Sequence, residues 1–177
     1  MPSNGCALES TFILLPASFC KTMPAGECSP YGIALDKSLN VYFVDVANDD
    51  VTECTNASHY TDCFVIESLY SFPESMFIDS SGNIWVSDSA CSGYVWENGA
   101  VKFTTGEAMD SIAVSKTGHV YVGWDAFCKG GNAGIMDLTD GELLPTLLKG
   151  GDSIAAVTPS LQFTAYYNGT VYQTKNV

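Results

Sequence analysis

The sequence predicts an all-β protein, a small β-propeller of about four blades with four strands in each. Two observations lead to this prediction. The composition is rich in Tyr, Phe, Val, Ile, Gly, Ser and Thr, which favours strands over helices. In addition, one strand–turn–strand pattern recurs four times along the 177 residues. A chain of this length builds one substantial core, so we treat residues 1–177 as a single propeller domain.

Each repeat consists of a short apolar strand, a polar turn and a second strand in which apolar or aromatic residues alternate with others. Aligning Asp36, Asp79, Ser115 and Thr158 gives spacings of 43, 36 and 43 residues, the length of one four-stranded blade. The four copies lie at residues 30–45 (PYGIALDKSLNVYFVD), 73–88 (PESMFIDSSGNIWVSD), 109–124 (MDSIAVSKTGHVYVGW) and, more loosely, 151–167 (GDSIAAVTPSLQFTAYY).

The segments between the repeats supply two further strands for each blade. After the second repeat, Asn98-Gly99 is a strong signal for a hairpin turn, and Asp140-Gly141 has the same role after the third repeat. After the first repeat the two strands are joined by a longer hairpin loop.

The last blade lacks one strand, because only residues 170–177 follow the fourth repeat. The strand-like run at residues 10–19 (STFILLPASF) precedes the first repeat and belongs to no unit of its own. We predict that it pairs as the outer strand of the last blade, which closes the ring. The alternatives are a fragment of a longer propeller and an open β-sandwich in which the similarity of the repeats is accidental.

The charge of the chain narrows the class of partner. The formal net charge is −13, and all seven basic residues are Lys. A negative chain without guanidinium groups is poorly suited to polyanions, so we expect neither nucleic acid nor membrane insertion. No segment reaches the roughly 18 apolar residues of a membrane span. Cations, small neutral molecules and glycans fit this charge better.

Seven Cys without a C-x-x-C pair, and only two His, favour disulfides over a structural zinc site. They predict an oxidising compartment and a secreted protein, and glycosylation sequons at Asn56 and Asn168 agree with secretion. The predicted pairs are Cys54 with Cys63, Cys20 with Cys28, and Cys91 with Cys128. This pairing leaves Cys6 without a partner, either as a free thiol in a monomer or as a bridge between two chains in a dimer.

The repeat unit P-x-x-(I/M)-x-(L/I/V)-D-x-x-G-x-(I/V)-(W/Y)-V-x-D resembles the blade of the gluconolactonase and senescence-marker-protein family, and of the related NHL-repeat and strictosidine-synthase-like propellers. The resemblance lies in a blade consensus and not in a catalytic signature. It implies a propeller fold and, from the first family, a divalent metal held by acidic and amide side chains at blade entrances. Those families usually have six blades, whereas this chain has material for four.

The positions that enter the inner strands are expected to surround the mouth of the central channel, where ligand sites gather. They are Tyr31, Glu74, Asp110 and Asp152. Crowded carboxylates repel one another unless a cation or protons neutralise them, so the three acids are candidate metal ligands for Ca²⁺ or Mg²⁺. The family's leading glutamate motif is absent, and Tyr31 stands where the family has an asparagine. The alternative is that these acids cap turns through backbone hydrogen bonds.

A second group of candidate ligand-binding residues lies where the second strands end: Asp45, Asp88, Trp124 and Asp125. Asp at this place in a blade also has a structural interpretation, since its side chain can bond the backbone amides of the following loop, and we favour that interpretation for Asp45 and Asp88. Trp124 offers a stacking surface for a sugar or flat metabolite, or simply packs.

These residues leave three functions open. The first is a metal-dependent hydrolase or lactonase acting on a small neutral metabolite, with Glu74 and Asp110 as catalytic groups. The second is a non-catalytic, lectin-like module that binds a glycan or small molecule through Tyr31 and Trp124. The third is a metal-free cyclase or condensing enzyme, similar to strictosidine-synthase-like propellers, with Glu74 as acid or base. Neither histidine lies near the acidic ring, so a Ser-His-Asp triad is not expected.

Overall fold

The computed structural model describes residues 17–23, 26, 28–68, 70–124, 128, 134–143, 154–155, 164–167 and 170–173. Its strands form four antiparallel sheets, and within each sheet the strands follow one another in chain order. The sheets contain β1 (Pro30–Leu35), β2 (Val41–Asp45), β3 (Asp50–Cys54) and β4 (Cys63–Glu67); β5 (Pro73–Ile78), β6 (Ile84–Asp88), β7 (Tyr94–Glu97) and β8 (Ala100–Thr104); β9 (Met109–Val114), β10 (Val120–Trp124), β11 (Gly134–Asp137) and β12 (Glu142–Leu143); and β13 (Ile154–Ala155), β14 (Thr164–Tyr167) and β15 (Thr170–Gln173).

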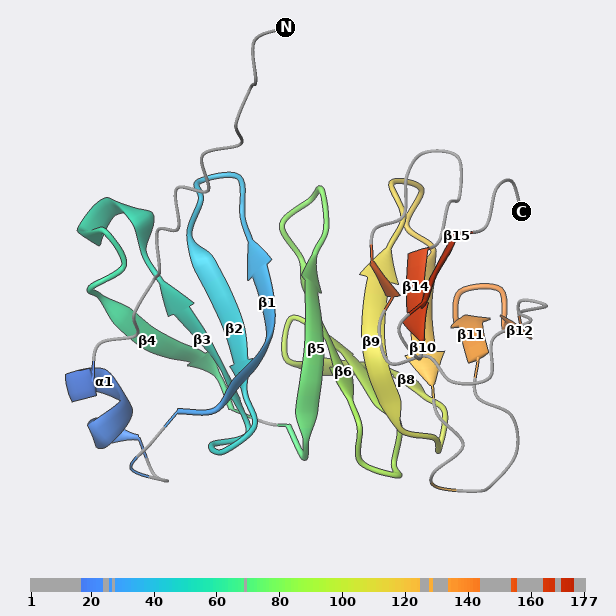
Figure 1. The fold of residues 1–177 in the computed structure, drawn as a ribbon, viewed down its shortest axis with the longest axis horizontal. Helices are drawn as coiled ribbons and strands as arrows, with labels where there is room; N and C mark the ends of the chain where they lie inside the picture. The colour runs from blue at the N-terminus through green and yellow to red at the C-terminus, as the bar shows by residue number, and fades with distance from the viewer. Residues whose placement is uncertain are drawn as a thin grey trace, which may run out of the picture.

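The sheets pack against one another mainly through their first strands. β5 lies along β1 on one side and along β9 on the other, and β13 lies against β9. Figure 1 shows β1, β5 and β9 side by side, with β1 and β14 separated by the other two strands. Sheets that pack in this radial way form a β-propeller, so the predicted fold class is confirmed.

The turn between the first two strands of a blade is held by the side chain that begins it. Asp36 Oδ1 accepts the backbone N–H groups of the residues two and four positions later, both at 2.8 Å, and Asp79 Oδ1 does the same at 2.8 and 2.9 Å. In the third blade, Ser115 Oγ accepts the N–H group four positions later at 2.9 Å. Gly82 and Gly118 end their turns with φ of 90°, a conformation that favours glycine.

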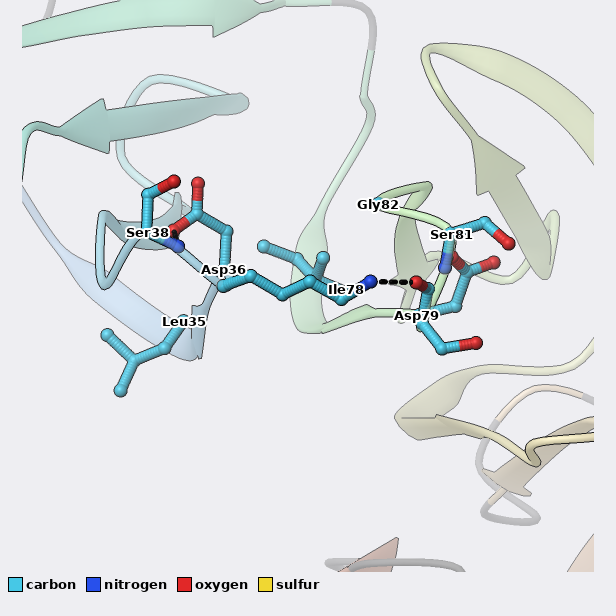
Figure 2. A pocket seen from close by; sticks show the side chains of 9 residues that line it. Leu35, Asp36, Ser38, Ile78, Asp79, Ser81 and Gly82 are labelled. Atoms are coloured by element: carbon cyan, nitrogen blue, oxygen red, sulfur yellow. Dashed lines mark hydrogen bonds between the residues drawn. The ribbon is translucent and has the colours of Figure 1, made fainter.

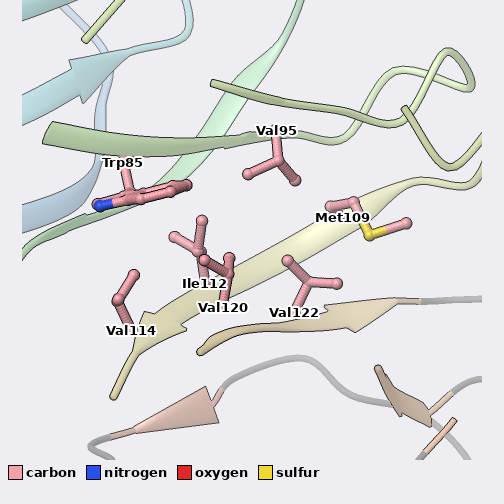
Figure 3. Packing of buried hydrophobic residues seen from close by; sticks show 7 residues of the cluster. All are labelled: Trp85, Val95, Met109, Ile112, Val114, Val120 and Val122. Carbon is pink, nitrogen blue, oxygen red and sulfur yellow. The ribbon is translucent and has the colours of Figure 1, made fainter. Parts of the chain in front are cut away.

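Alternation along each strand directs side chains to both neighbouring blades. Met76 and Val86 pack toward the first sheet, whereas Phe77 and Trp85 pack toward the third, because successive strand residues face opposite sides. The larger core lies between the second and third sheets (Figure 3) and consists of Trp85, Val95, Met109, Ile112, Val114, Val120 and Val122. The other core joins the first and second sheets through Val44, Val51, Tyr70, Met76 and Val86.

The end of the predicted closing strand is helical. Residues 17–19 begin helix α1 (Ala17–Thr22), so the strand prediction is wrong there. The hydroxyl of Thr22 donates to the carbonyl of Phe19 at 2.7 Å, and the N–H of Met23 donates to the carbonyl of Cys20 at 3.3 Å. These short-range bonds favour a helical turn over an extended chain. Residues 10–16 of the predicted strand lie outside the described residues.

All three predicted disulfides are present. Cys20–Cys28 joins α1 to the segment before β1, Cys54–Cys63 closes the hairpin loop of the first blade, and Cys91–Cys128 links loops of the second and third blades. Their Cα–Cα distances are 5.2, 4.1 and 5.3 Å, respectively. Within the described part of the chain, no helix is long and apolar enough to cross a membrane.

Candidate functional site

The inner strand of the second blade begins with a β-bulge. Pro73 pairs with Asp88 and Ser75 pairs with Ser87, which are consecutive residues of β6. Glu74 is therefore the extra residue of the bulge on β5. A bulge of this kind bends the strand and changes the direction in which the extra side chain points.

The third blade repeats this feature at the equivalent position. Met109 pairs with Trp124 and Ser111 pairs with Gly123, which makes Asp110 the extra residue of the bulge. In the first blade the register shifts between Pro30 and Ile33, a stretch that contains Tyr31. β-bulges are frequent next to binding and active sites, where they re-aim a side chain. The bulges therefore coincide with the residues predicted to line the channel mouth.

Because β5 lies along both β1 and β9, the bulge residues Tyr31, Glu74 and Asp110 begin three adjoining strands at the same end. Glu74 and Asp110 are half-buried, whereas Tyr31 is 59% exposed. Two further candidates, Asp125 and Asp152, lie outside the described residues. The structure thus brings the strands that carry two of the three predicted metal ligands together.

Asp45 and Asp88 are fully buried and hold the loops around this end. Asp45 Oδ1 accepts the backbone N–H groups of Ser29 at 2.9 Å and Ala47 at 3.0 Å. Asp88 accepts the backbone N–H group of Ser71 at 3.1 Å and that of the residue two positions later at 2.8 Å. These bonds match the structural interpretation of both aspartates, since each carboxylate ties together two separate segments.

A titratable group that the sequence analysis missed lies beside Asp45. Asp50 begins β3, pairs with Asp45 across the ladder and is only 3% exposed. Burial and the Asp45 carboxylate raise its pKa to about 6, while a hydrogen bond from the Thr52 hydroxyl at 3.2 Å acts in the opposite direction. Burial, Asp88 and Asp45 also raise the pKa of Asp49. The signal in the sequence was the acidic pair Asp49-Asp50 in the turn directly after a strand.

Trp124 lies at the end of β10, opposite Met109 and next in the sheet to the Asp110 bulge. Its ring packs partly against the apolar core between the second and third blades. The indole Nε1 is buried, and no hydrogen-bond partner lies within reach of it among the described residues. A buried N–H donor of this kind calls for an acceptor, such as water or a ligand oxygen.

Three possible metal-ligating groups gather at the opposite end of the third blade. His119 Nδ1 lies 2.9 Å from Asp137 Oδ2 and 3.5 Å from Asp140 Oδ2, and the three ligand atoms lie within 4.8 Å of one another. The hydrogen bond with Asp137 raises the pKa of His119. Asp137 Oδ1 also accepts the backbone N–H group of Thr139 at 2.9 Å. The Asp137 carboxylate therefore caps the turn after β11 and at the same time pairs with His119.

A cavity of about 420 Å³ also lies at this opposite end, between the first turns of the first and second blades (Figure 2). Leu35, Asp36 and Ile78 are among the residues that line it. Lys37 Nζ crosses the seam and donates to the carbonyl of Ser80 at 2.5 Å. The cavity lies in the seam between two blades, and the Asp36 carboxylate beside it already accepts hydrogen bonds within its own turn.

No family model matches the chain, and no curated protein matches it. Among solved structures it is similar to a gluconolactonase from Xanthomonas campestris, with 10% identity, a TM-score of 0.58 and coverage of 84% of this chain and 62% of the other. A virginiamycin B lyase from Staphylococcus aureus gives 16% identity, a TM-score of 0.59 and coverage of 84% and 56%. A structure of a nidogen/laminin complex gives 21% identity, a TM-score of 0.63 and coverage of 78% and 56%.

These similarities show the fold. They agree with the resemblance of the repeats to gluconolactonase-like and NHL-type propellers. The chain spans about three-fifths of the length of the structures it matches.

Proposed function

We propose that the end of the propeller at which β1, β5 and β9 begin is the ligand site of a metal-dependent hydrolase that cleaves an ester or lactone of a small neutral metabolite. The observation that supports this most directly is that Glu74 and Asp110 occupy the same bulge position in adjoining inner strands. The fold similarity to a gluconolactonase supports the reaction class.

The donor atoms suit a hard divalent cation. Glu74 and Asp110 supply carboxylate oxygens on strands that lie side by side, and we propose that Asp152 completes the set for Ca²⁺ or Mg²⁺. A net charge of −13 further favours cation binding. When bound, the cation would polarise the ester carbonyl.

The chain's own residues have distinct roles in this proposal. Asp50 has a pKa of about 6, so its carboxylate is mostly ionised at neutral pH. Because this pKa lies close to neutral pH, we propose that the carboxylate accepts a proton from water. The buried Asp45 and Asp88 fix the surrounding loops. The Cys91–Cys128 disulfide joins the loop after β6 to the loop after β10, which limits the motion of one blade against the next.

Thermal unfolding with Ca²⁺ or Mg²⁺ tests the metal site. We expect either ion to raise the Tm of the wild-type chain, and we expect Glu74→Gln and Asp110→Asn to abolish the rise. Asp62→Asn is the matched control, because Asp62 is an exposed carboxylate in the hairpin loop of the first blade. A Tm rise that survives in both site variants, or no rise in the wild type, would contradict the proposal. Hydrolysis of a panel of neutral lactones then tests the reaction.

A second function, a non-catalytic binding module for a glycan or small neutral molecule, is favoured by one observation, the buried indole N–H of Trp124. A ligand oxygen would satisfy this donor. A glycan screen tests it: Trp124→Phe keeps the ring but removes the donor, and Trp124→Ala removes both. Binding that is unchanged in Trp124→Ala rules out this residue as the anchor.

We further propose that the protein acts outside the cell. Three disulfides in a chain of this size persist in oxidising surroundings. Expression in a secreting eukaryotic host tests this directly, because a secreted chain should carry the three bonds and, at Asn56 or Asn168, a glycan that a glycosidase removes. A chain recovered in the medium without either feature would count against the proposal.

A further inference from the structure

A row of large apolar side chains lies uncovered on the first strand of the propeller. Tyr31, Ile33 and Leu35 of β1 are 59%, 66% and 57% exposed, and Leu39 in the following turn is 55% exposed. Ile33 and Leu35, two residues apart, stand on one face of the strand. Directly opposite them on β2, Phe43 and Val41 are buried, so the most exposed apolar strand residues on this face belong to the inner strand.

The equivalent rows in the next two blades are covered. Met76 on β5 is 5% exposed, and Ile112 and Val114 on β9 are 3% and 6% exposed. Each of these rows packs against the blade that precedes it in the chain. In the repeat alignment, Ile33 corresponds to Met76 and Ile112. The row on β1 is therefore the part of the first blade that receives a preceding blade.

The contacts between blades indicate which element fits this row. Neighbouring blades meet chiefly through their inner strands, as β1 does with β5 and β5 with β9. The last blade continues this mode of packing, because its inner strand β13 lies against β9. Within the described strands β13 does not reach β1, since β5 and β9 stand between them (Figure 1).

We propose that the row formed by Tyr31, Ile33 and Leu35 is an interface that receives the last blade, β13 to β15, of a second copy of this chain. Each copy then offers its first blade to the other copy's last blade. Two such contacts are related by a two-fold axis, so the assembly closes as a dimer. The two chains together supply eight blades, which lies within the range that propellers adopt. The contact extends the packing that already joins the blades within one chain.

Light scattering coupled to size exclusion measures the mass directly. We expect the wild-type chain to have twice the mass of one chain, and we expect Ile33→Asp and Leu35→Asp to reduce it to one, with unchanged circular dichroism because both side chains are exposed. Val101→Asp is the matched control: Val101 is 46% exposed on the outer strand β8 and should leave the dimer intact. Because each copy carries a charge of −13, added salt should strengthen the dimer.

Three results would overturn the proposal. One is a wild-type chain that stays monomeric at concentrations on the order of 100 µM, which limits any association to less than about 5.5 kcal/mol. Another is a dimer that survives both Ile33→Asp and Leu35→Asp, because the contact would then lie elsewhere. The third is a mass that grows beyond two chains with concentration, which indicates an open head-to-tail assembly.

Discussion

Replacing Asp50 by Asn should stabilise the protein at neutral pH. Asp50 is 3% exposed and lies beside Asp45, and together these surroundings raise its pKa from 3.8 to about 6. A raised carboxyl pKa means that the folded state binds the proton more tightly than the unfolded state does. The contribution of Asp50 to the free energy of unfolding is therefore fully present below about pH 4, and this contribution is lost as the pH rises through about 6.

The size of the effect follows from the two pKa values. At about 1.4 kcal/mol for each pH unit, a rise from 3.8 to about 6 corresponds to roughly 3 kcal/mol of unfolding free energy at pH 7.5. Asn has nearly the same shape, carries no charge, and keeps an oxygen that accepts the hydrogen bond from the Thr52 hydroxyl. Asp50→Asn should recover most of this energy at pH 7.5 and very little at pH 4.

Urea unfolding at pH 4, 5.5 and 7.5 measures the difference in the free energy of unfolding between variant and wild type. The contributions of the other carboxylates are the same in both proteins and cancel in this difference. Asp62→Asn serves as the control, because Asp62 is exposed and its replacement should change stability little at any of these pH values. The reasoning is refuted if Asp50→Asn destabilises the chain at pH 7.5, or if its effect is the same at all three pH values. If Asp50 also acts as the base in hydrolysis, the stabilised variant should be inactive.

Three further predictions concern single contacts. The double variant Cys91→Ser/Cys128→Ser opens a bond across 37 residues and should cost roughly 4 kcal/mol in urea unfolding; a change below about 1 kcal/mol would show that the loop closure matters little. Gly93→Ala adds a Cβ that would overlap the Thr105 hydroxyl and the Glu107 carbonyl, at a φ of 59°. It should lower the free energy of unfolding by roughly 3 kcal/mol. Gly82→Ala has open space around the added Cβ and should lower it by only about 1 kcal/mol. His119→Gln should lower the Tm below pH 6.5, where the His119–Asp137 pair is charged. The difference in Tm from the wild type should vanish as the pH rises above the raised pKa of His119. An equal loss of Tm at pH 5.5 and pH 8.5 would contradict this prediction.

Much of the fold could be predicted because its signals are local. The turns that begin at Asp36 and Asp79 depend on a side chain that bonds amides two and four residues away. The hairpin at Asn98-Gly99 requires two residues that tolerate positive φ, and they have φ values of 49° and 73°. The Cys54–Cys63 bond closes a single hairpin.

The candidate site could be predicted only in part. The positions of Glu74 and Asp110 at the starts of neighbouring strands follow from the repeat, but the bulges that contain them appear only in the pairing register. The raised pKa of Asp50 depends on burial and on the charge of Asp45, and the acidic pair Asp49-Asp50 alone did not distinguish it from an exposed turn. The prediction of a strand over residues 17–19 was wrong because an apolar run is compatible with a helix as well as with a strand.

The sequence by itself determined the repeat of strands and turns and the sheet class, because these depend on residue spacing and on bonds within a blade. It predicted the three disulfide pairs, which the structure confirmed. Only the tertiary structure decided what each strand faces. Ile33 and Ile112 occupy the same place in the repeat, yet one is 66% exposed and the other 3%. The physical reason is that burial depends on which surface packs against a residue, and that surface comes from a different blade.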